Sequence, residues 1–293
     1  MPMTSVLRKP AHKLSVVESI SASAGAVNDD RAGHAGPCVW VIDGATDCTG
    51  EKYLPGQSDA AWFAEKFHSS LLTRSLGAGV SLPDLIEDIT QSVRADFHRE
   101  AIRGLTLREH QPSAAALIAR VHAGILDVAA LGDCQLFAAQ PGRRSALCGV
   151  DRSRLGDRVA IERIRAAMKE ENLGWLAARA KYKPRGDEGR RMMNRPGGYA
   201  VLSIDMAPLD LIHREAIPLE SGTRLLLATD GFTRLYEVFG AYSEETLLEA
   251  AFEKGLAALI KELRSLEGKD PACEKAPRLK LRDDATALLV IAE

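Results

Sequence analysis

The sequence predicts an α+β fold in which two β-sheets are covered by helices. Short apolar runs rich in β-branched residues indicate buried strands, and four of these runs have an acidic residue at one end. Two amphipathic stretches that follow the first such run indicate helices packed against a sheet. The chain has 293 residues, of which 46% are hydrophobic, so it can bury a sizeable core.

Composition narrows the classes of partner and the cellular location. A formal net charge of −2 gives no general reason to expect nucleic acid or an anionic membrane as partner. No apolar run approaches the roughly 20 residues of a membrane helix, and the basic first residues lack the apolar segment of a signal peptide. Five cysteines, an odd number without a CxxC pair, argue against a disulfide framework or structural zinc. A cytoplasmic protein is therefore expected.

The four acid-bearing strands are the feature most suggestive of function. Val39–Ile42 leads directly into Asp43-Gly44, and the ranges 225–231 (LLLATDG) and 128–133 (VAALGD) repeat that order. In the range 283–290 (DDATALLV) the acids precede the strand instead. A carboxylate at the end of a buried strand is costly unless a cation meets it. We therefore expect these strand ends to converge and their acids to hold a divalent metal.

The remaining elements follow in order along the chain. Residues 1–13 are expected to be a flexible leader, and residues 14–293 a single domain, because no repeat or linker is apparent. Between the first strand and Val39 lies a loop with the pair Asp29-Asp30, which taken alone is most simply a solvated turn. Helices are expected over 59–76, 82–102 and 232–238, with a long one from Ser243 through Leu263. Further strands are expected over 14–23, 113–121, 124–131, 135–139, 199–204, 211–217 and 224–229.

Residues 141–198 differ from the rest because charge is dense and apolar runs nearly disappear. Two helices are expected within 157–180, followed by a mobile loop over 181–198 that is rich in Gly, Pro and Arg. An insertion of this kind suits a lid or a recognition flap. Its arginines offer contacts to a phosphorylated substrate, although a solvated charged face is the simpler interpretation of any one of them: Arg185, Arg190, Arg191 and Arg195.

The donor chemistry favours hard cations. Carboxylates, backbone carbonyls and water suit Mg²⁺ or Mn²⁺, and no paired-His motif typical of zinc competes. Two such ions about 4 Å apart activate a water for in-line attack on phosphorus. The absence of GxSxG and of a GxxxxGK[ST] loop agrees with a hydrolase that needs no protein nucleophile.

The succession of motifs resembles one family. The order NDDR, VIDGAT, LGDCQ, GGYAVLS, LLLATDGF and RDDATALLV, spread over about residues 14–292, is similar to the metal-dependent protein phosphatases of the protein phosphatase 2C type, PPM. Each motif alone is weak, but all of them in this order form a specific signal. The resemblance implies a four-layer α-β-β-α sandwich of two mostly antiparallel sheets, with two or three Mg²⁺ or Mn²⁺ ions in the cleft between them.

The resemblance also implies the site residues, position by position. Six residues match the metal positions: Asp29, Asp43, Gly44, Asp133, Asp230 and Asp283. Asp43 matches the acid that bridges two ions and Gly44 the carbonyl of the first site, while Asp230 and Asp283 match the second site. Asp43 and Asp230 are thus the expected catalytic residues. Asp29, with Asp30 beside it, matches an acid that acts through water, Asp133 one associated with a third ion, and Asp284 the position beside the last ligand.

Two departures from the family pattern bear on activity. Many members have a histidine after the first Asp-Gly, a candidate general acid, where this chain has Ala45-Thr46-Asp47. The arginine that usually precedes the NDD motif is also missing, so Arg31 and the flap residue Arg195 are the candidate phosphate-binding groups. The expected activity is hydrolysis of phosphoserine or phosphothreonine in a protein. A metal-binding but catalytically weak or inactive relative that recognises a partner protein is the alternative, and an unrelated hydrolase of small phosphate esters is a third.

Overall fold

The computed structural model describes residues 13–45, 50–74, 79–144, 146–148 and 154–293. The expected leader 1–13 therefore lies outside the described residues except for its last position. One five-stranded sheet has the order β1-β11-β10-β6-β7. Its strands are β1 (Leu14–Ala22), β11 (Ala285–Ala292), β10 (Arg224–Ala228), β6 (Gln135–Ala139) and β7 (Ala146–Cys148).

The second sheet has the order β2-β3-β4-β5-β9, with a short β8 paired to β4. Its strands are β2 (Arg31–Ala35), β3 (Cys38–Gly44), β4 (Ser113–His122), β5 (Ile125–Leu131), β9 (His213–Pro218) and β8 (Leu202–Ser203). Every strand pair within these two sheets is antiparallel. The α+β class with two antiparallel sheets, predicted from the sequence, is confirmed.

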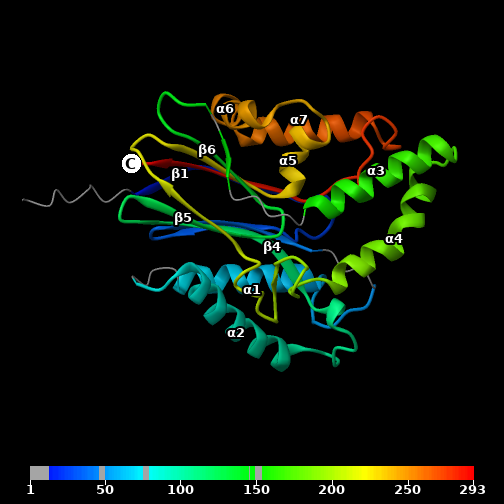
Figure 1. The fold of residues 1–293 in the computed structure, drawn as a ribbon, viewed down its shortest axis with the longest axis horizontal. Coiled ribbons are helices and arrows are strands. Elements are labelled where there is room, and N and C mark those ends of the chain that lie inside the picture. Colours follow the sequence, from blue (N-terminus) through cyan, green and yellow to red (C-terminus); the bar gives the residue numbers. More distant parts are fainter. Residues whose placement is uncertain (1–12, 46–49, 75–78, 145, 149–153) are drawn as a thin grey trace, which may run out of the picture.

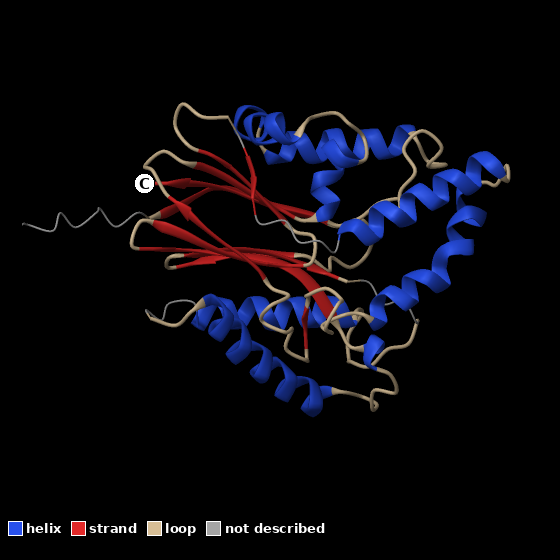
Figure 2. Cartoon of the chain, viewed as in Figure 1, coloured by secondary structure: helices blue, strands red, loops and turns tan. Residues whose placement is uncertain are grey.

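Helices cover the outer face of each sheet and complete four layers (Figures 1 and 2). α1 (Asp59–Arg74) and α2 (Leu82–Glu100) pack on the six-stranded sheet. α5 (Asp230–Glu237), α6 (Glu244–Lys254) and α7 (Leu256–Lys269) pack on the five-stranded sheet. A short 3₁₀ helix, Arg108–His110, precedes β4. Across the described ranges, no helix combines the length and apolarity needed to cross a membrane.

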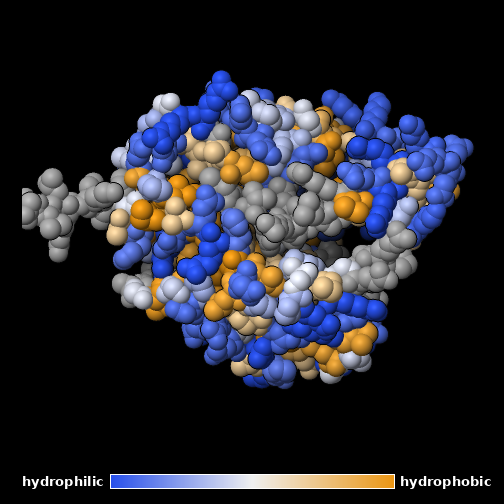
Figure 3. Space-filling view, viewed as in Figure 1, coloured by the Kyte–Doolittle hydropathy of each residue, from blue (hydrophilic) through white to orange (hydrophobic). Residues whose placement is uncertain are grey.

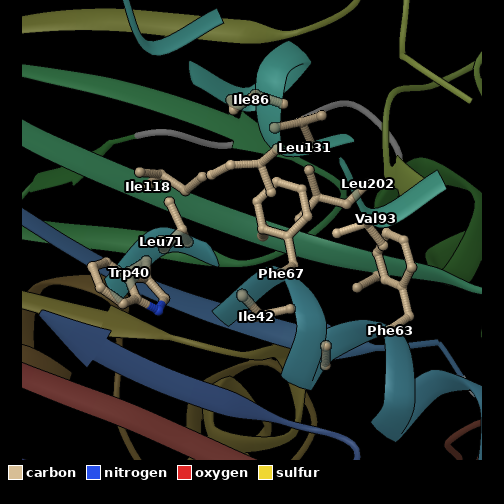
Figure 4. Packing of buried hydrophobic residues seen from close by; sticks show 14 of the residues in the cluster. Trp40, Ile42, Phe63, Phe67, Leu71, Ile86, Val93, Ile118, Leu131 and Leu202 are labelled. Atoms are coloured by element: carbon tan, nitrogen blue, oxygen red, sulfur yellow. The ribbon is translucent and has the colours of Figure 1, made fainter. Parts of the chain in front are cut away.

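The side chains of β3 point alternately into two hydrophobic cores, and this alternation determines the direction of Asp43. Trp40 and Ile42 pack against Phe63 and Phe67 of the α1 layer (Figure 4). Val39 and Val41 face the other way, into the core between the two sheets. Side chains two positions apart share a face of a strand, so Asp43 continues the row that points between the sheets. The acid is therefore placed at the end of the inter-sheet core.

A helical arm projects beside the sandwich, and its extent differs from the prediction for residues 181–198. It consists of α3 (Arg154–Glu170) and α4 (Trp175–Arg191), and it is largely hydrophilic on its surface (Figure 3). The Trp175 indole donates a 2.7 Å hydrogen bond to the Arg278 carbonyl, which ties the arm to the segment before β11. The expected loop 181–198 is wrong in its first half, where the helix continues. Lys, Arg and Glu in that stretch are good helix formers despite the Gly and Pro residues between them.

Three other expectations differ from the structure. The long helix predicted from Ser243 is two helices, because Gly255 between them has a positive φ of 81°, a conformation that interrupts an α-helix. β2 was not predicted, since its sequence RAGHA contains no apolar run. The strand expected over 199–204 is reduced to the two residues of β8.

Candidate metal centre

Five acid-bearing segments reach the same end of the sandwich, opposite the C-terminus (Figure 1). They are the β1–β2 loop with Asp29 and Asp30, the end of β3 with Asp43, the β5–β6 turn with Asp133, the start of α5 with Asp230, and the segment before β11 with Asp283. The antiparallel registers bring the end of β3 beside the start of β4, and the end of β10 beside the start of β11. β3 also lies against β10 and β11 across the inter-sheet core.

Asp43 is at the centre of this cluster of acids. Burial raises its pKa well above the usual value for a carboxyl group, and the neighbouring negative charges raise it further. Those charges come from the other segments: Asp30, Asp230, Asp133 and Asp283. The structure therefore brings together acids that lie between positions 30 and 283 of the sequence, and their mutual repulsion favours a bound cation.

Asp30 is the most deeply buried acid of the cluster, with 2% of its surface exposed. The Thr229 hydroxyl donates a 2.9 Å hydrogen bond to its carboxylate, and the same hydroxyl accepts a 3.0 Å bond from the Thr286 backbone N–H. Burial raises the pKa of Asp30 to about 8, although the threonine hydrogen bonds act in the opposite direction. Asp30 thus joins the NDD loop to the strand that leads into Asp230.

Asp284 fixes the loop that carries Asp29. Its carboxylate accepts hydrogen bonds from the backbone N–H groups of Asp29 and Ala24, at 2.7 and 2.6 Å. Burial raises the pKa of Asp29, and its buried Oδ1 atom has no hydrogen-bond partner among the described residues. Gly44 lies so close that a Cβ there would be 2.6 Å from the Asp29 carbonyl oxygen. The glycine of the first Asp-Gly is therefore required for close approach to the NDD loop.

Asp283 is already surrounded by cationic groups. Lys280 Nζ lies 2.8 Å from its Oδ1 atom, and Arg234 Nη2 donates to its Oδ2 atom at 2.7 Å. Arg234 also pairs at 3.5 Å with the buried Glu267, which pairs at 2.8 Å with Arg264. Arg264 in turn donates to the Asp283 carbonyl at 2.8 Å. This closed set of ion pairs, which joins α5, α7 and the segment before β11, fixes the position of Asp283.

The two candidate phosphate-binding arginines lie in different surroundings. Arg31 pairs with Glu65 at 2.7 Å and donates to the carbonyls of Asn28 and Asp30, so its guanidinium holds the NDD loop. Arg195 is exposed in the turn that follows α4. Arg190 of the arm donates a 3.0 Å hydrogen bond to Ser113, whose carbonyl accepts from the Ala45 backbone next to Gly44. The side chain of Arg185 and the residues 46–49 lie outside the described part of the chain.

The donor set fits a hard divalent cation in its chemistry. All six expected ligands supply oxygen atoms, their negative charges accumulate, and Asp29 presents a buried oxygen without a described partner. In the described ranges, no three or more His, Cys, Asp or Glu side chains form a group that could hold an ion as they stand. The Asp43 side of the cluster is thus the better fit, because the Asp283 side already contains Lys280 and Arg234.

Solved structures that share the fold include serine/threonine phosphatases. The chain aligns with the Mycobacterium tuberculosis phosphatase PstP/Ppp at 14% identity and a TM-score of 0.55, over 96% of this chain and 98% of the other. It aligns with the catalytic domain of PstP in complex with two manganese ions at 14% identity and a TM-score of 0.52, with the same coverage. A phosphatase of S. agalactiae gives 14% identity and a TM-score of 0.52, over 96% and 100%.

The two sheets and their helix layers thus have the fold of the PPM-type serine/threonine phosphatases, as the motifs indicated. No protein-family model matches the chain, and no curated protein matches it either. At 12–14% identity the likeness concerns the fold, and the chemistry must be argued from this chain's own residues.

Two residues near the site were not identified from the sequence. Lys280 lies three positions before Asp283, and a charged residue in a polar loop is usually solvated. Arg234 lies four positions after Asp230, and this spacing puts both residues on one face of α5. Helical spacing from the Asp-Gly motif is therefore a signal that would have pointed to Arg234.

Proposed function

We propose that the protein is a Mg²⁺- or Mn²⁺-dependent phosphatase that hydrolyses phosphoserine or phosphothreonine in a protein substrate. The proposal depends above all on the gathering of acids from five segments around Asp43, within a fold found in solved serine/threonine phosphatases. Carboxylates brought so close repel one another unless a cation compensates them. We also infer that residues 14–293 act as one domain, with the α3–α4 arm as its recognition flap.

The residues that would hold the ions are the six expected from the sequence: Asp29, Asp43, Gly44, Asp133, Asp230 and Asp283. Bound Mg²⁺ or Mn²⁺ supplies positive charge for the phosphate and an activated water for in-line attack on phosphorus. The chain's own contribution is positional. Asp284 and Thr229 hold the NDD loop against the strand ends, and Gly44 allows that loop to approach closely.

Substrate binding would fall to the arm. Arg190 is placed beside the segment that follows Gly44, and Arg195 is exposed near the same end of the arm. Guanidinium groups bind phosphate oxygens in a bidentate manner, so these two residues suit a phosphorylated side chain. Arg31 is engaged by Glu65 and by two carbonyls, through which it holds its own loop.

One observation favours a second candidate function, a catalytically weak or inactive metal-binding module that recognises a partner protein. The usual histidine after Asp-Gly is replaced by Ala45, and Arg31 is occupied in holding its own loop. Such a chain would bind Mn²⁺ and a phosphorylated partner without turnover. The two functions are distinguished by a single assay.

The assay is hydrolysis of a phosphoserine or phosphothreonine peptide and of p-nitrophenyl phosphate, with and without Mn²⁺. We expect Mn²⁺-stimulated turnover by the wild-type chain and its loss in Asp43→Asn. Asp210→Asn, an exposed acid in a turn far along the chain, is the matched control and should retain activity. Wild-type turnover no higher than that of Asp43→Asn would contradict the phosphatase, and Mn²⁺ binding without turnover would favour the second candidate.

A further inference from the structure

The carboxylate of Asp283 is saturated with positive charge from its own chain. Its Oδ1 atom lies 2.8 Å from Lys280 Nζ, and its Oδ2 atom accepts from Arg234 at 2.7 Å. The Asp283 side chain is 14% exposed and that of Arg234 is 7% exposed, so this ion pair is shielded from water, whereas Lys280 is 38% exposed. A carboxylate whose two oxygens each face a cation is a poor ligand for a divalent ion, because the ion would meet like charges at once.

Among the side chains around Asp283, positive charges exceed negative charges by one. Arg234, Arg264 and Lys280 carry three positive charges, whereas Glu267 and Asp283 carry two negative ones. Arg234 is shared between the two carboxylates, and Arg264 is held by Glu267 and by backbone carbonyls. The ammonium group of Lys280 is the remaining charge, and it faces the acid cluster.

The acids that Lys280 faces are those of the expected second metal site. Lys280 contacts Asp283 directly at 2.8 Å, and its ammonium group is near enough to interact with the charges of Asp230 and Asp43. The ammonium group of Lys280 therefore lies among the carboxylates that a second ion would share.

We propose that Lys280 takes the place of one divalent cation, so that the chain binds a single Mn²⁺ or Mg²⁺ ion on the Asp43 side of the cluster. This inference rests on the proposed function, because it assumes that the acid cluster is a metal centre. The Asp43 side has the unpartnered oxygen of Asp29 as a further donor, beside the Gly44 carbonyl that the sequence motif leads us to expect. On the Asp230–Asp283 side, the ammonium group of Lys280 supplies the positive charge.

The test is calorimetric titration of the full chain with Mn²⁺ alone, at fixed pH. Lys280→Gln removes the charge and keeps a side chain of similar length, whereas Lys280→Arg keeps the charge. Lys275→Gln removes an exposed charge from the same segment and serves as the matched control. The thermal unfolding of each variant without metal verifies that it is folded.

We expect the wild-type chain, Lys280→Arg and Lys275→Gln to bind about one ion. Lys280→Gln should bind a second ion, or the first at least about tenfold more tightly, since a like charge has been removed at close range. Two ions bound by the wild-type chain, or the same affinity and stoichiometry in Lys280→Gln, would overturn the inference and leave the proposed function intact. No Mn²⁺ binding by any of the four chains would defeat both.

Discussion

The Thr229 hydroxyl donates a hydrogen bond to the Asp30 carboxylate across 199 positions of sequence, and this bond joins two acid-bearing segments. Thr229 is fully buried, and its oxygen also accepts from the Thr286 N–H. Thr229→Val keeps the shape but leaves two buried polar groups without this partner, so the free energy of unfolding should fall by about 2–4 kcal/mol. Urea denaturation measures the change. Thr229→Ser, which retains the hydroxyl, should be markedly more stable than the valine variant, and equal stabilities would contradict the assigned role.

Gly44→Ala tests the close approach of the NDD loop. A Cβ at this position would lie 2.6 Å from the Asp29 carbonyl and 3.2 Å from Ala60 Cβ, and the backbone of Gly44 is held by its pairing with β4. The loop must move, which should cost about 1–3 kcal/mol of stability and weaken Mn²⁺ binding. Gly25→Ala, in the same loop with nothing within 4 Å, is the control. If both variants bind Mn²⁺ like the wild-type chain, the contact is unimportant.

Arg234 should be far more important for stability than a surface arginine. Its side chain is 7% exposed and pairs with Glu267, whose side chain is 0% exposed. Arg234→Leu takes one of two cationic partners from each of two buried carboxylates, Glu267 and Asp283, which should lower the free energy of unfolding by about 3–5 kcal/mol. Arg224→Leu, which breaks a half-exposed pair with Glu249, should cost no more than about 1 kcal/mol. Chemical denaturation of both variants measures the two losses of stability. Losses of similar size would show that the buried pair contributes no more to stability than the half-exposed one.

Glu100 provides a stability effect with a defined pH dependence. The hydrogen bond from Lys66, with that from the Trp62 indole, lowers its pKa to about 2 from 4.5. The folded state therefore favours the ionised form, and this stabilisation is present above pH 4.5 and lost as the pH falls towards 2. Because the group lies near solvent, Glu100→Gln should cost only about 1 kcal/mol at pH 7.

Urea denaturation at several pH values checks this prediction. The stability difference between the wild-type chain and Glu100→Gln should shrink steadily between pH 4.5 and the acid limit of the measurement. Glu87→Gln, an exposed residue of the same helix, should show little difference at any pH. A difference that stays constant down to low pH would show that the charge of Glu100 is not its cause.

The sequence predicted the strands and the acids for a clear physical reason. Buried strands such as Cys38–Gly44 must be apolar on both faces, and an acid at the end of such a run stands out. β2 escaped notice because Arg31–Ala35 is a partly exposed edge strand of small and polar residues. Its pairing depends on β3 rather than on its own composition.

The ion pairs of Asp283 could not be predicted in the same way. Lys280 is close to Asp283 in sequence, but its position depends on how the segment before β11 is held by Arg234 and Arg264. Those two arginines come from α5 and α7, whose relative placement is a property of the whole helix layer. The break between α6 and α7 at Gly255 is part of that arrangement. It was not predicted from the sequence, since a lone glycine is tolerated within a helical pattern.

The pairing of β1 with β11 has a consequence for how the protein folds. Leu14 is paired with Ala292, so the β1–β11 side of the five-stranded sheet forms only when segments from both ends of the described chain have met. Contacts of such large sequence separation form slowly, because the chain entropy of closure is lost before the contact energy is gained. Asp283 directly precedes β11, so it joins the other acids only when this strand pairs. A chain in which β11 has not yet paired therefore has an incomplete acid cluster, and the cluster is completed late in folding.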